Sequence, residues 1–265
     1  MSLAAPVIAT AVAARGLGVS YGATLAVDDL DLDVAPGGWL AIIGPNGAGK
    51  TSVLRALAGL VEHRGELWVG GRPRSELARR QLARVVAYVP QRPVVPPDMS
   101  VFTYVMLGRT PYHGWLGAEG GDDRRIVADA LHRLDLDDLA GRPLAAVSGG
   151  ELQRAVLARA VAQRADVLLL DEPTSALDLG HQQSALEQVD RLRCDHGLTI
   201  VSTLHDLTLA GQFADQVVLL ANGRAVARGA PGDVLTEEII ATHYGADVRV
   251  VTGSDGEVWV LPVRR

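Results

Sequence analysis

The sequence predicts an α/β fold built around a mostly parallel sheet, and three observations support this prediction. After residue 150, apolar runs of strand length alternate with helical patterns, which is the order of β-α-β units with parallel strands. The run at residues 38 to 44 is apolar without alternation, as is typical of a strand buried on both faces. A proline-rich stretch from residue 91 leads into helical patterns, which predicts a helical insert in this frame.

The first 90 residues predict strands, turns and two helices. Residues 8 to 43 have the pattern of strands with turns, and apolar positions alternate within residues 23 to 35. A helix follows from Lys50 and is expected to end at Gly59 or soon after. Two further strands, at residues 65 to 71 and 84 to 90, flank a polar helix.

The rest of the chain continues the alternation after the insert. Within the insert, helical patterns cover residues 101 to 108 and 123 to 134. The Asn222-Gly223 pair is a β-hairpin signal. The other expected elements are a helix at 151 to 164, a strand at 166 to 173, a helix at 181 to 193, a strand at 198 to 206, a short helix, a strand at 216 to 223, and a tail from 232 with a helix and two short strands.

The composition excludes several classes of protein. The formal net charge is −6 and no Lys/Arg-rich run is present, so nucleic acid is not expected as a partner. A single cysteine, Cys194, excludes an internal disulfide and a cysteine metal cluster and fits a reducing compartment. No apolar run reaches the ~18 to 20 residues that span a bilayer, and residues 2 to 14 lack the basic start of a signal peptide. We therefore expect a soluble, cytoplasmic chain that reaches a membrane only through a partner.

The stretch GPNGAGKT, residues 44 to 51, contains Lys50, the only lysine of the chain. It matches G-x-x-x-x-G-K-[ST] and lies between an apolar strand and a helix, which is the context of a phosphate-binding loop. Its glycines let backbone N–H groups turn inward around an anion, and the helix N-terminus adds a positive dipole. Lysine places a compact charge on a flexible stem, which suits this loop better than the wider guanidinium of arginine. The Thr51 hydroxyl can bind Mg²⁺.

Two acidic residues, Asp171 and Glu172, end the apolar stretch DVLLLDEP. Adjacent residues point to opposite faces of a strand, so the two carboxylates can take different tasks. Asp171 suits a Mg²⁺ ion, and Glu172 suits the polarisation of an attacking water. Taken alone, the stretch is more typical of a strand followed by an acidic turn. The phosphate loop elsewhere in the chain reverses this and favours the chemical interpretation.

The stretch VSGGE, residues 147 to 151, has two interpretations. Ser148 and Glu151 form the S-x-x-E pattern of a helix capping box, with Gly149 and Gly150 as the turn. Alternatively, the glycine N–H groups and the Ser148 hydroxyl form a second anion site. Two glycines in a first helical turn cost stability, so a cap alone does not explain them.

Taken in order, these motifs resemble those of the nucleotide-binding subunit of an ABC transporter, and the resemblance covers nearly the whole chain. Residues 44 to 51 resemble the Walker A loop, LLLDEP resembles Walker B with its catalytic glutamate, and VSGGE resembles the signature, usually LSGGQ. Four single residues complete the set: Tyr21 of the A-loop, Gln91 of the Q-loop, Asp178 of the D-loop and His205 of the switch. The signature departs from the family pattern at Val147 and Glu151, which puts in doubt any contact made by the family's glutamine.

The resemblance implies one domain over residues 1 to 265 with the ABC ATPase fold: a P-loop NTPase (RecA-like) core, an antiparallel β subdomain and a helical insert. Residues 1 to 90 and 162 to 265 would form the nucleotide-binding core, and residues 91 to 161 the helical subdomain with the signature. ATP and Mg²⁺ are the implied cofactors. The implied catalytic residues are Glu172, His205 and Gln91; the implied Mg²⁺ site is Thr51, Gln91 and Asp171; and the implied ATP-binding residues are Tyr21, Gly44, Pro45, Asn46, Gly47, Gly49, Lys50, Thr51, Ser148, Gly149, Gly150 and Asp178.

Family members pair head to tail, so the resemblance implies a homodimer with each ATP between the Walker A loop of one subunit and the signature of the other. The segment VFTYVMLGRTPYHGW and the tail resemble ATPases of iron–siderophore, haem and cobalamin importers. The implied partners are two transmembrane permease subunits and, indirectly, a periplasmic or lipoprotein substrate-binding protein, which puts the chain at the cytoplasmic face of the membrane. The alternatives are an importer of another substrate, a soluble ABC ATPase of cofactor assembly or repair, and an unrelated P-loop kinase.

Overall fold

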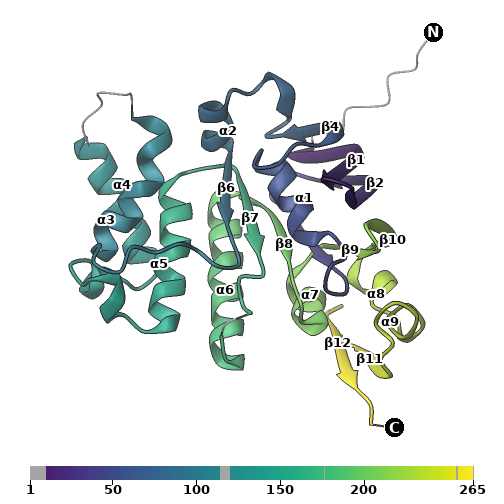
Figure 1. Ribbon diagram of the computed structural model, residues 1–265. Helices are drawn as coiled ribbons and strands as arrows, with labels where there is room; N and C mark the ends of the chain where they lie inside the picture. The colour runs from purple at the N-terminus through teal and green to yellow at the C-terminus, as the bar shows by residue number, and fades with distance from the viewer. Residues whose placement is uncertain (1–9, 114–119, 176, 255, 265) are drawn as a thin grey trace.

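The computed structural model describes residues 10–113, 120–175, 177–254 and 256–264. A six-stranded sheet with the order β10-β9-β3-β8-β7-β6 forms the centre, and a four-stranded sheet with the order β2-β1-β4-β5 covers one of its faces (Figure 1). The helices α5, α6 and α7 cover the other face. The chain therefore forms layers around the central sheet, with a helical insert at one side.

The central sheet is parallel except at one edge, where β10 pairs antiparallel with β9. The carboxyl ends of its five parallel strands therefore meet at one edge, where open α/β sheets bind their ligands. The strands are β3 (Trp39–Ile43), β6 (Val86–Val89), β7 (Val167–Asp171), β8 (Thr199–Thr203), β9 (Gln216–Ala221) and β10 (Arg224–Gly229).

Strand β3 is buried on both faces, as its apolar run predicts. Trp39, Ala41 and Ile43 pack into the apolar cluster beneath α5, α6 and α7. Leu40 and Ile42 pack into the cluster on the opposite face. Because successive strand residues point to opposite faces, every position of β3 must be apolar.

The small antiparallel sheet lies over helix α1 (Lys50–Leu57), whose residues Val53, Leu54 and Leu57 are fully buried between the two sheets. Its first strand runs through Tyr21. A 3-10 turn η1 (Arg74–Glu76) and helix α2 (Arg79–Val85) follow its last strand, β5. The strands are β1 (Val12–Tyr21), β2 (Thr24–Val34), β4 (Arg64–Val69) and β5 (Arg72–Pro73).

The helical insert lies beside the β6 edge of the central sheet (Figure 1). Helix α5 both ends the insert and leads back into the sheet through β7, so it belongs to both parts of the molecule. The elements are α3 (Val101–Met106), η2 (Leu107–Tyr112), α4 (Gly121–Arg133), η3 (Asp137–Leu139), η4 (Leu144–Ala146) and α5 (Gly149–Ala162).

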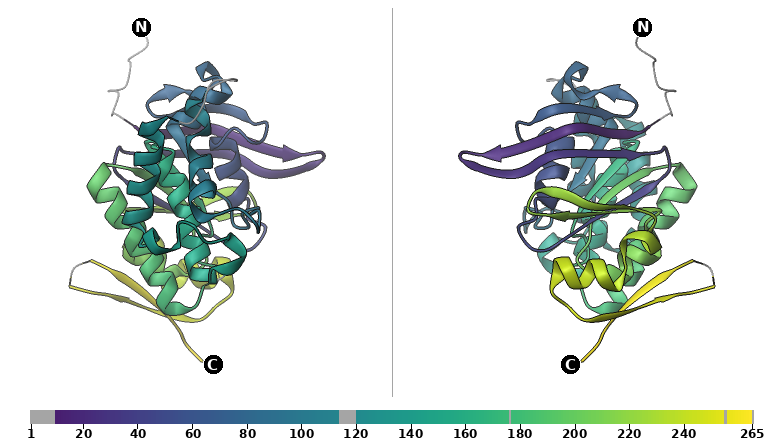
Figure 2. Two further views of the ribbon diagram at one scale, coloured as in Figure 1. Left: turned by 90° about the vertical axis from the view of Figure 1, so that its left-hand side faces the viewer. Right: turned by 90° about the vertical axis from the view of Figure 1, so that its right-hand side faces the viewer.

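The C-terminal part has two short helices where the sequence predicts one. Pro231 begins the first, and Thr236 starts the second by accepting a hydrogen bond from the Ile239 N–H. A final hairpin projects from the body of the molecule (Figure 2). The elements are α6 (Leu179–His196), α7 (Leu207–Phe213), α8 (Pro231–Val234), α9 (Glu237–Tyr244), β11 (Val248–Thr252) and β12 (Val258–Pro262).

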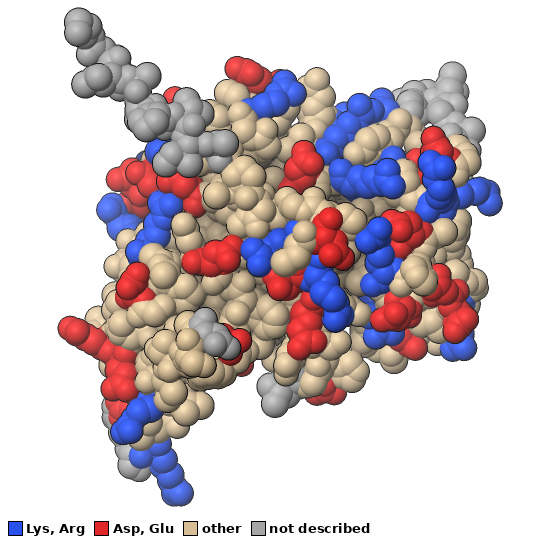
Figure 3. Space-filling model, turned by 180° about the vertical axis from the view of Figure 1, so that it is seen from behind, with Lys and Arg blue, Asp and Glu red and all other residues tan. Residues whose placement is uncertain are grey.

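The surface mixes charges of both signs. On the face seen in Figure 3, acidic and basic side chains are interspersed over the apolar and neutral surface. Several form pairs, such as Arg193 with Asp190 and Asp215. None of the helices in the described part of the chain has the length and apolarity to span a membrane.

Candidate functional site

The phosphate-binding loop connects β3 to α1, as the motif predicts. Gly44 has a φ of 146°, and a Cβ at this position would lie 2.1 Å from the Leu220 carbonyl oxygen. Gly49 has a φ of 102°, and a Cβ there would lie 2.3 Å from the Ala26 carbonyl oxygen. Both positions therefore require glycine. The loop between them consists of Pro45, Asn46, Gly47 and Ala48.

Lys50 begins helix α1 and is 5 % exposed. Its ammonium group donates hydrogen bonds to the carbonyl oxygens of Gly44, at 2.7 Å, and Pro45, at 3.1 Å. Burial lowers the pKa of Lys50, and the charges of Glu172 and Asp171 oppose this effect. The ammonium is therefore held within the loop, on the side of the two carboxylates.

Asp171, the last residue of β7, is 1 % exposed and accepts three hydrogen bonds. The Thr51 and Thr203 hydroxyls each donate to its Oδ1 at 2.9 Å, and the Tyr88 hydroxyl donates to its Oδ2 at 3.0 Å. Burial, and then the charge of Asp171, raise the pKa of Tyr88 to about 12, so the phenol remains a donor at neutral pH. These contacts fix the carboxylate beside the Thr51 hydroxyl.

Glu172 follows Asp171 in the left-handed region, with a φ of 49°. For a residue other than glycine this conformation costs about 1–3 kcal/mol. Its N–H donates to the Thr203 hydroxyl oxygen at 2.8 Å. Its Oε1 lies 2.5 Å from His205 Nε2, and its Oε2 accepts a hydrogen bond from the Gln91 amide. The strained backbone thus turns the carboxylate towards two residues from other segments.

Ser148 is the N-cap of α5, and the capping box is present. The Ser148 hydroxyl accepts from the Glu151 N–H at 3.3 Å, and Glu151 Oε2 accepts from the Ser148 N–H at 2.7 Å. The second bond lowers the pKa of Glu151. Gly149 and Gly150 are the first residues of the helix rather than a turn before it. Their N–H groups therefore belong to the unpaired first turn of a helix, which favours an anion.

Asp178 is the N-cap of α6, and its Oδ1 accepts from the His181 N–H at 3.0 Å. The hydrogen bond from this N–H, and then the His181 ring, lower the pKa of Asp178. Tyr21 lies apart, exposed at the end of β1. Its hydroxyl and that of Tyr88 hydrogen-bond to Arg55, whose pKa they raise, with Tyr88 the larger cause.

Apart from Tyr21 and the loop residues 44 to 49, the residues singled out in the sequence form two groups. The first group surrounds the end of β7 and consists of Lys50, Thr51, Gln91, Asp171, Glu172 and His205. The second consists of Ser148, Gly149, Gly150 and Asp178, at the beginnings of α5 and α6. Across the described ranges, no hydrogen bond or ion pair joins the two groups.

Two site residues were missed by the sequence motifs, Tyr88 and Thr203. Tyr88 stands on β6 opposite Leu169, and Thr203 ends β8 opposite Asp171. Both strands flank β7, so their polar residues reach the carboxylate. The signal was a polar side chain near the carboxyl end of an apolar strand, and it is informative only once the strand order is known.

His113 follows η2 in the helical insert and contacts a carboxylate there. His113 Nε2 lies 2.9 Å from Asp123 Oδ2, and Arg109 Nε donates to Asp123 Oδ1 at 2.9 Å. The hydrogen bonds from Arg109, and then His113, lower the pKa of Asp123 to about 2. Within the described ranges no group of three or more His, Cys, Asp or Glu residues is placed to hold a metal ion.

Comparison with known proteins identifies the family. Residues 27–175 match the family model described as ABC transporter. The chain is 39% identical over 254 residues to Hemin import ATP-binding protein HmuV of Rhodococcus jostii (strain RHA1), covering 95% of this chain and 86% of the relative. It is 35% identical over 237 residues to Iron(3+)-hydroxamate import ATP-binding protein FhuC of Bacillus subtilis (strain 168), covering 89% and 88%.

A solved structure agrees with this similarity. It is titled "An inward-facing conformation of a putative metal-chelate type ABC transporter" and matches with a TM-score of 0.83 and 27% sequence identity. The match covers 97% of this chain and 98% of that one. The predicted ABC ATPase fold is thereby confirmed. The chain belongs to the ABC transporter family, as one of its ATP-binding, ATP-hydrolysing subunits.

Proposed function

We propose that the first group of residues is the hydrolytic centre and that this ATPase energises a membrane importer. The meeting of Thr51, Asp171, Glu172, Gln91 and His205 beside the phosphate loop supports this most directly. Five residues from four segments of the chain converge there through short contacts. Lys50 neutralises phosphate charge, Glu172 activates an in-line water, and His205 holds the γ-phosphate. Tyr21 stacks on the adenine.

The donor set fits Mg²⁺. Thr51 Oγ1 and Asp171 Oδ1 lie 2.9 Å apart, and the Gln91 amide is at the neighbouring carboxylate. Hydroxyl, carboxylate and amide oxygens are hard ligands of the kind that Mg²⁺ prefers, and protein sites usually supply only a few of them beside substrate phosphates. Thr51, Asp171 and Gln91 would hold the ion, which would neutralise charge on the β- and γ-phosphates.

The second group completes a site on another copy of the chain. Ser148, Gly149 and Gly150 present a helix N-terminus, and nothing within the described residues joins them to their own phosphate loop. In a twofold head-to-tail dimer this helix start faces the γ-phosphate bound to the partner, with Asp178 beside it. The same contact then occurs twice, since a C2 interface is self-complementary.

The transported substrate is of the iron–siderophore, haem or cobalamin type. Similarity over about nine-tenths of the chain to relatives named for hemin and iron(3+)-hydroxamate import supports this class, as does one named for cobalamin import. Two permease subunits hold the ATPase dimer at the cytoplasmic face of the membrane. A periplasmic or lipoprotein binding protein delivers the substrate to the permease and does not touch this chain.

Reconstitution tests the proposal. The chain is co-expressed with the permease encoded beside its gene, and the complex is placed in proteoliposomes with the matching binding protein. We expect ATP-dependent uptake of one of three probes, a ferric hydroxamate, haemin or cyanocobalamin, and no uptake with the Glu172→Gln subunit. ATP hydrolysis without membrane association would contradict the importer assignment. A complex that transports none of the three probes would contradict the proposed substrate class.

A further inference from the structure

His181 occupies the position where the first turn of α6 approaches the first turn of α5. It lies in the first turn of α6, three residues after Asp178. Its ring faces Gly150, the second residue of α5. A Cβ on Gly150 would lie 3.1 Å from His181 Cδ2 and 3.5 Å from His181 Nε2. The ring therefore lies in close contact with the glycine, and a Cβ at this position would require the ring to move by a few tenths of an ångström.

The ring is also held from its other edge. Its Nδ1 lies 2.7 Å from Asp178 Oδ1, the same oxygen that accepts the His181 backbone N–H. One carboxylate thus caps the helix and sets the orientation of the ring. Through His181, Asp178 of the D-loop is linked to Gly150 of the signature.

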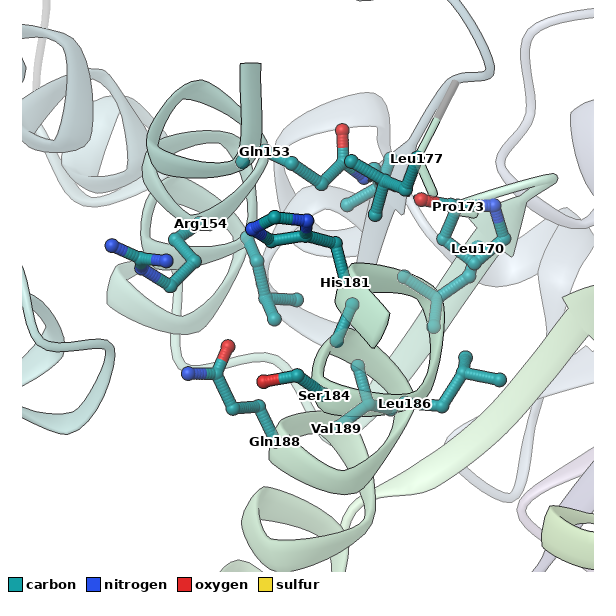
Figure 4. Close-up of a pocket in the computed structure, with 14 residues that line it drawn as sticks. Gln153, Arg154, Leu170, Pro173, Leu177, His181, Ser184, Leu186, Gln188 and Val189 are labelled. Atoms are coloured by element: carbon teal, nitrogen blue, oxygen red, sulfur yellow. Dashed lines mark hydrogen bonds between the residues drawn. The ribbon is translucent and has the colours of Figure 1, made fainter. Parts of the chain in front are cut away.

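Below the ring, a cavity separates α5 from α6. Its lining includes Gln153 and Leu157 of α5 and Ser184 and Val189 of α6, as Figure 4 shows for the labelled side chains. Near its mouth, the insert and the core meet at His181 and at a 2.9 Å hydrogen bond from the Gln153 amide to the Pro173 carbonyl oxygen. These two contacts lie at the N-terminal ends of α5 and α6, next to the signature glycines and the D-loop, whereas the apolar residues further along both helices pack in the main core.

We propose that His181 is a positioning residue: its ring sets the spacing between Gly150 and Asp178, so that the signature and the D-loop of one subunit approach the partner's ATP as a single unit. This inference rests on the proposed composite site. It assigns His181 no contact with ATP and no part in the chemical step. Its effect is on assembly of the closed dimer and hence on turnover.

The test uses the full-length chain with Glu172→Gln, which retains the ATP dimer. His181→Ala removes the ring, and we expect ATP–Mg²⁺-driven dimerisation, measured by analytical ultracentrifugation, to weaken at least tenfold. His181→Phe keeps the ring and loses the bond to Asp178, and we expect a loss of about threefold. In chains that retain Glu172, kcat should fall in the same order. The affinity of the monomer for a fluorescent ATP analogue should change by less than twofold, because the phosphate loop is untouched.

Ser184→Ala is the matched control, because Ser184 lies one turn further along α6 and lines the same cavity. It should dimerise like the parent. If the His181 variants dimerise as tightly as Ser184→Ala, the inference is wrong. If their monomers also lose ATP affinity or thermal stability, His181 has a general structural role and the inference is likewise wrong. Failure of the Glu172→Gln parent itself to dimerise would instead contradict the proposed function. If His181→Ala does not fold, the test depends on whether the His181→Phe variant dimerises more weakly than the Glu172→Gln parent.

Discussion

Thr51 Oγ1 donates a 2.9 Å hydrogen bond to Asp171 Oδ1 and so joins the phosphate loop to the end of β7. The two residues are 120 positions apart in sequence. Thr203 donates to the same oxygen, and Tyr88 to the other. The carboxylate that we propose as a Mg²⁺ ligand is thus oriented by strands on both sides, and each contact can be tested separately.

Tyr88→Phe removes one of these donors and keeps the ring. A hydrogen bond to a charged group contributes about 1.5–3 kcal/mol, so we expect the Mg²⁺ concentration for half-maximal ATPase activity to rise about tenfold. Because the pKa of Tyr88 is about 12, the phenol stays protonated below pH 10, and the ratio of wild-type to variant activity should be flat from pH 7 to 9. A ratio that changes over this range would contradict the donor role.

Glu172→Gln should abolish turnover and preserve ATP binding. The amide keeps the shape of the side chain but cannot accept a proton from water, and loss of a general base costs about 10²–10⁴-fold in rate. Phosphate release and nucleotide affinity are measured on the same preparation. Hydrolysis within twofold of wild type would exclude Glu172 as the activating residue.

Lys50→Arg should lower kcat/KM at least tenfold although the charge is retained. The ammonium lies between the Gly44 and Pro45 carbonyl oxygens at 2.7 and 3.1 Å, and a planar guanidinium cannot occupy the same space. Steady-state kinetics with ATP provide the measurement. Arg55→Lys, on the same helix but outside the loop, is the control for a change between the two residue types. Normal kinetics for Lys50→Arg would remove the steric argument.

Ser148→Arg should prevent ATP-driven dimerisation in the Glu172→Gln background. It places a large cationic side chain at the start of α5 and removes the capping hydroxyl, whose loss costs about 1 kcal/mol. Ser148→Ala loses only the cap and hydroxyl and serves as the control for helix stability. A dimer formed equally well by the Arg variant in ultracentrifugation would show that this helix start does not face the partner.

Asp123→Asn should lower the free energy of unfolding by about 3 kcal/mol, since it leaves the buried Arg109 without its carboxylate partner. The folded-state pKa of Asp123, about 2, lies below the unfolded value of about 3.9. The stabilisation that the ionised Asp123 carboxylate gives to the folded state is therefore present above about pH 4. It is lost as the pH falls from about 4 to about 2. Urea titrations at pH 7, 4 and 3 measure this, with the exposed neighbour Asp122→Asn as the control. Equal stability of both variants at pH 7 would contradict the prediction.

Much of the fold follows from local sequence pattern. The apolar run at Trp39–Ile43 predicts burial on both faces, and Asn222-Gly223 predicts the β9–β10 turn. The short helix α8 was not foreseen, because Pro231 and Thr236 lie too close together to separate two helices by periodicity. The observed helix ends also differ by a few residues from the expected ones, because they depend on caps such as Ser148 rather than on the apolar pattern.

The sequence singles out site residues where they form contiguous motifs or, as with Gln91 and His205, where the family resemblance supplies their place. Lys50, Thr51 and Asp171 belong to such motifs, and their contacts are short. Tyr88 and Thr203 reach Asp171 only because the strand order places β6 and β8 on either side of β7. The link between His181 and Gly150 depends on how α5 packs against α6, and no local pattern encodes this.

Both oxygens of the Glu172 carboxylate are engaged by other side chains, and this bears on how fast a single subunit consumes ATP. An oxygen that already faces His205 or accepts from Gln91 is poorly placed to draw a proton from water. Gln91 precedes the helical insert, and His205 precedes α7, on which the C-terminal hairpin packs. We therefore expect an isolated subunit to hydrolyse ATP slowly, and its rate to rise if binding of a partner displaces either of these two contacts to Glu172.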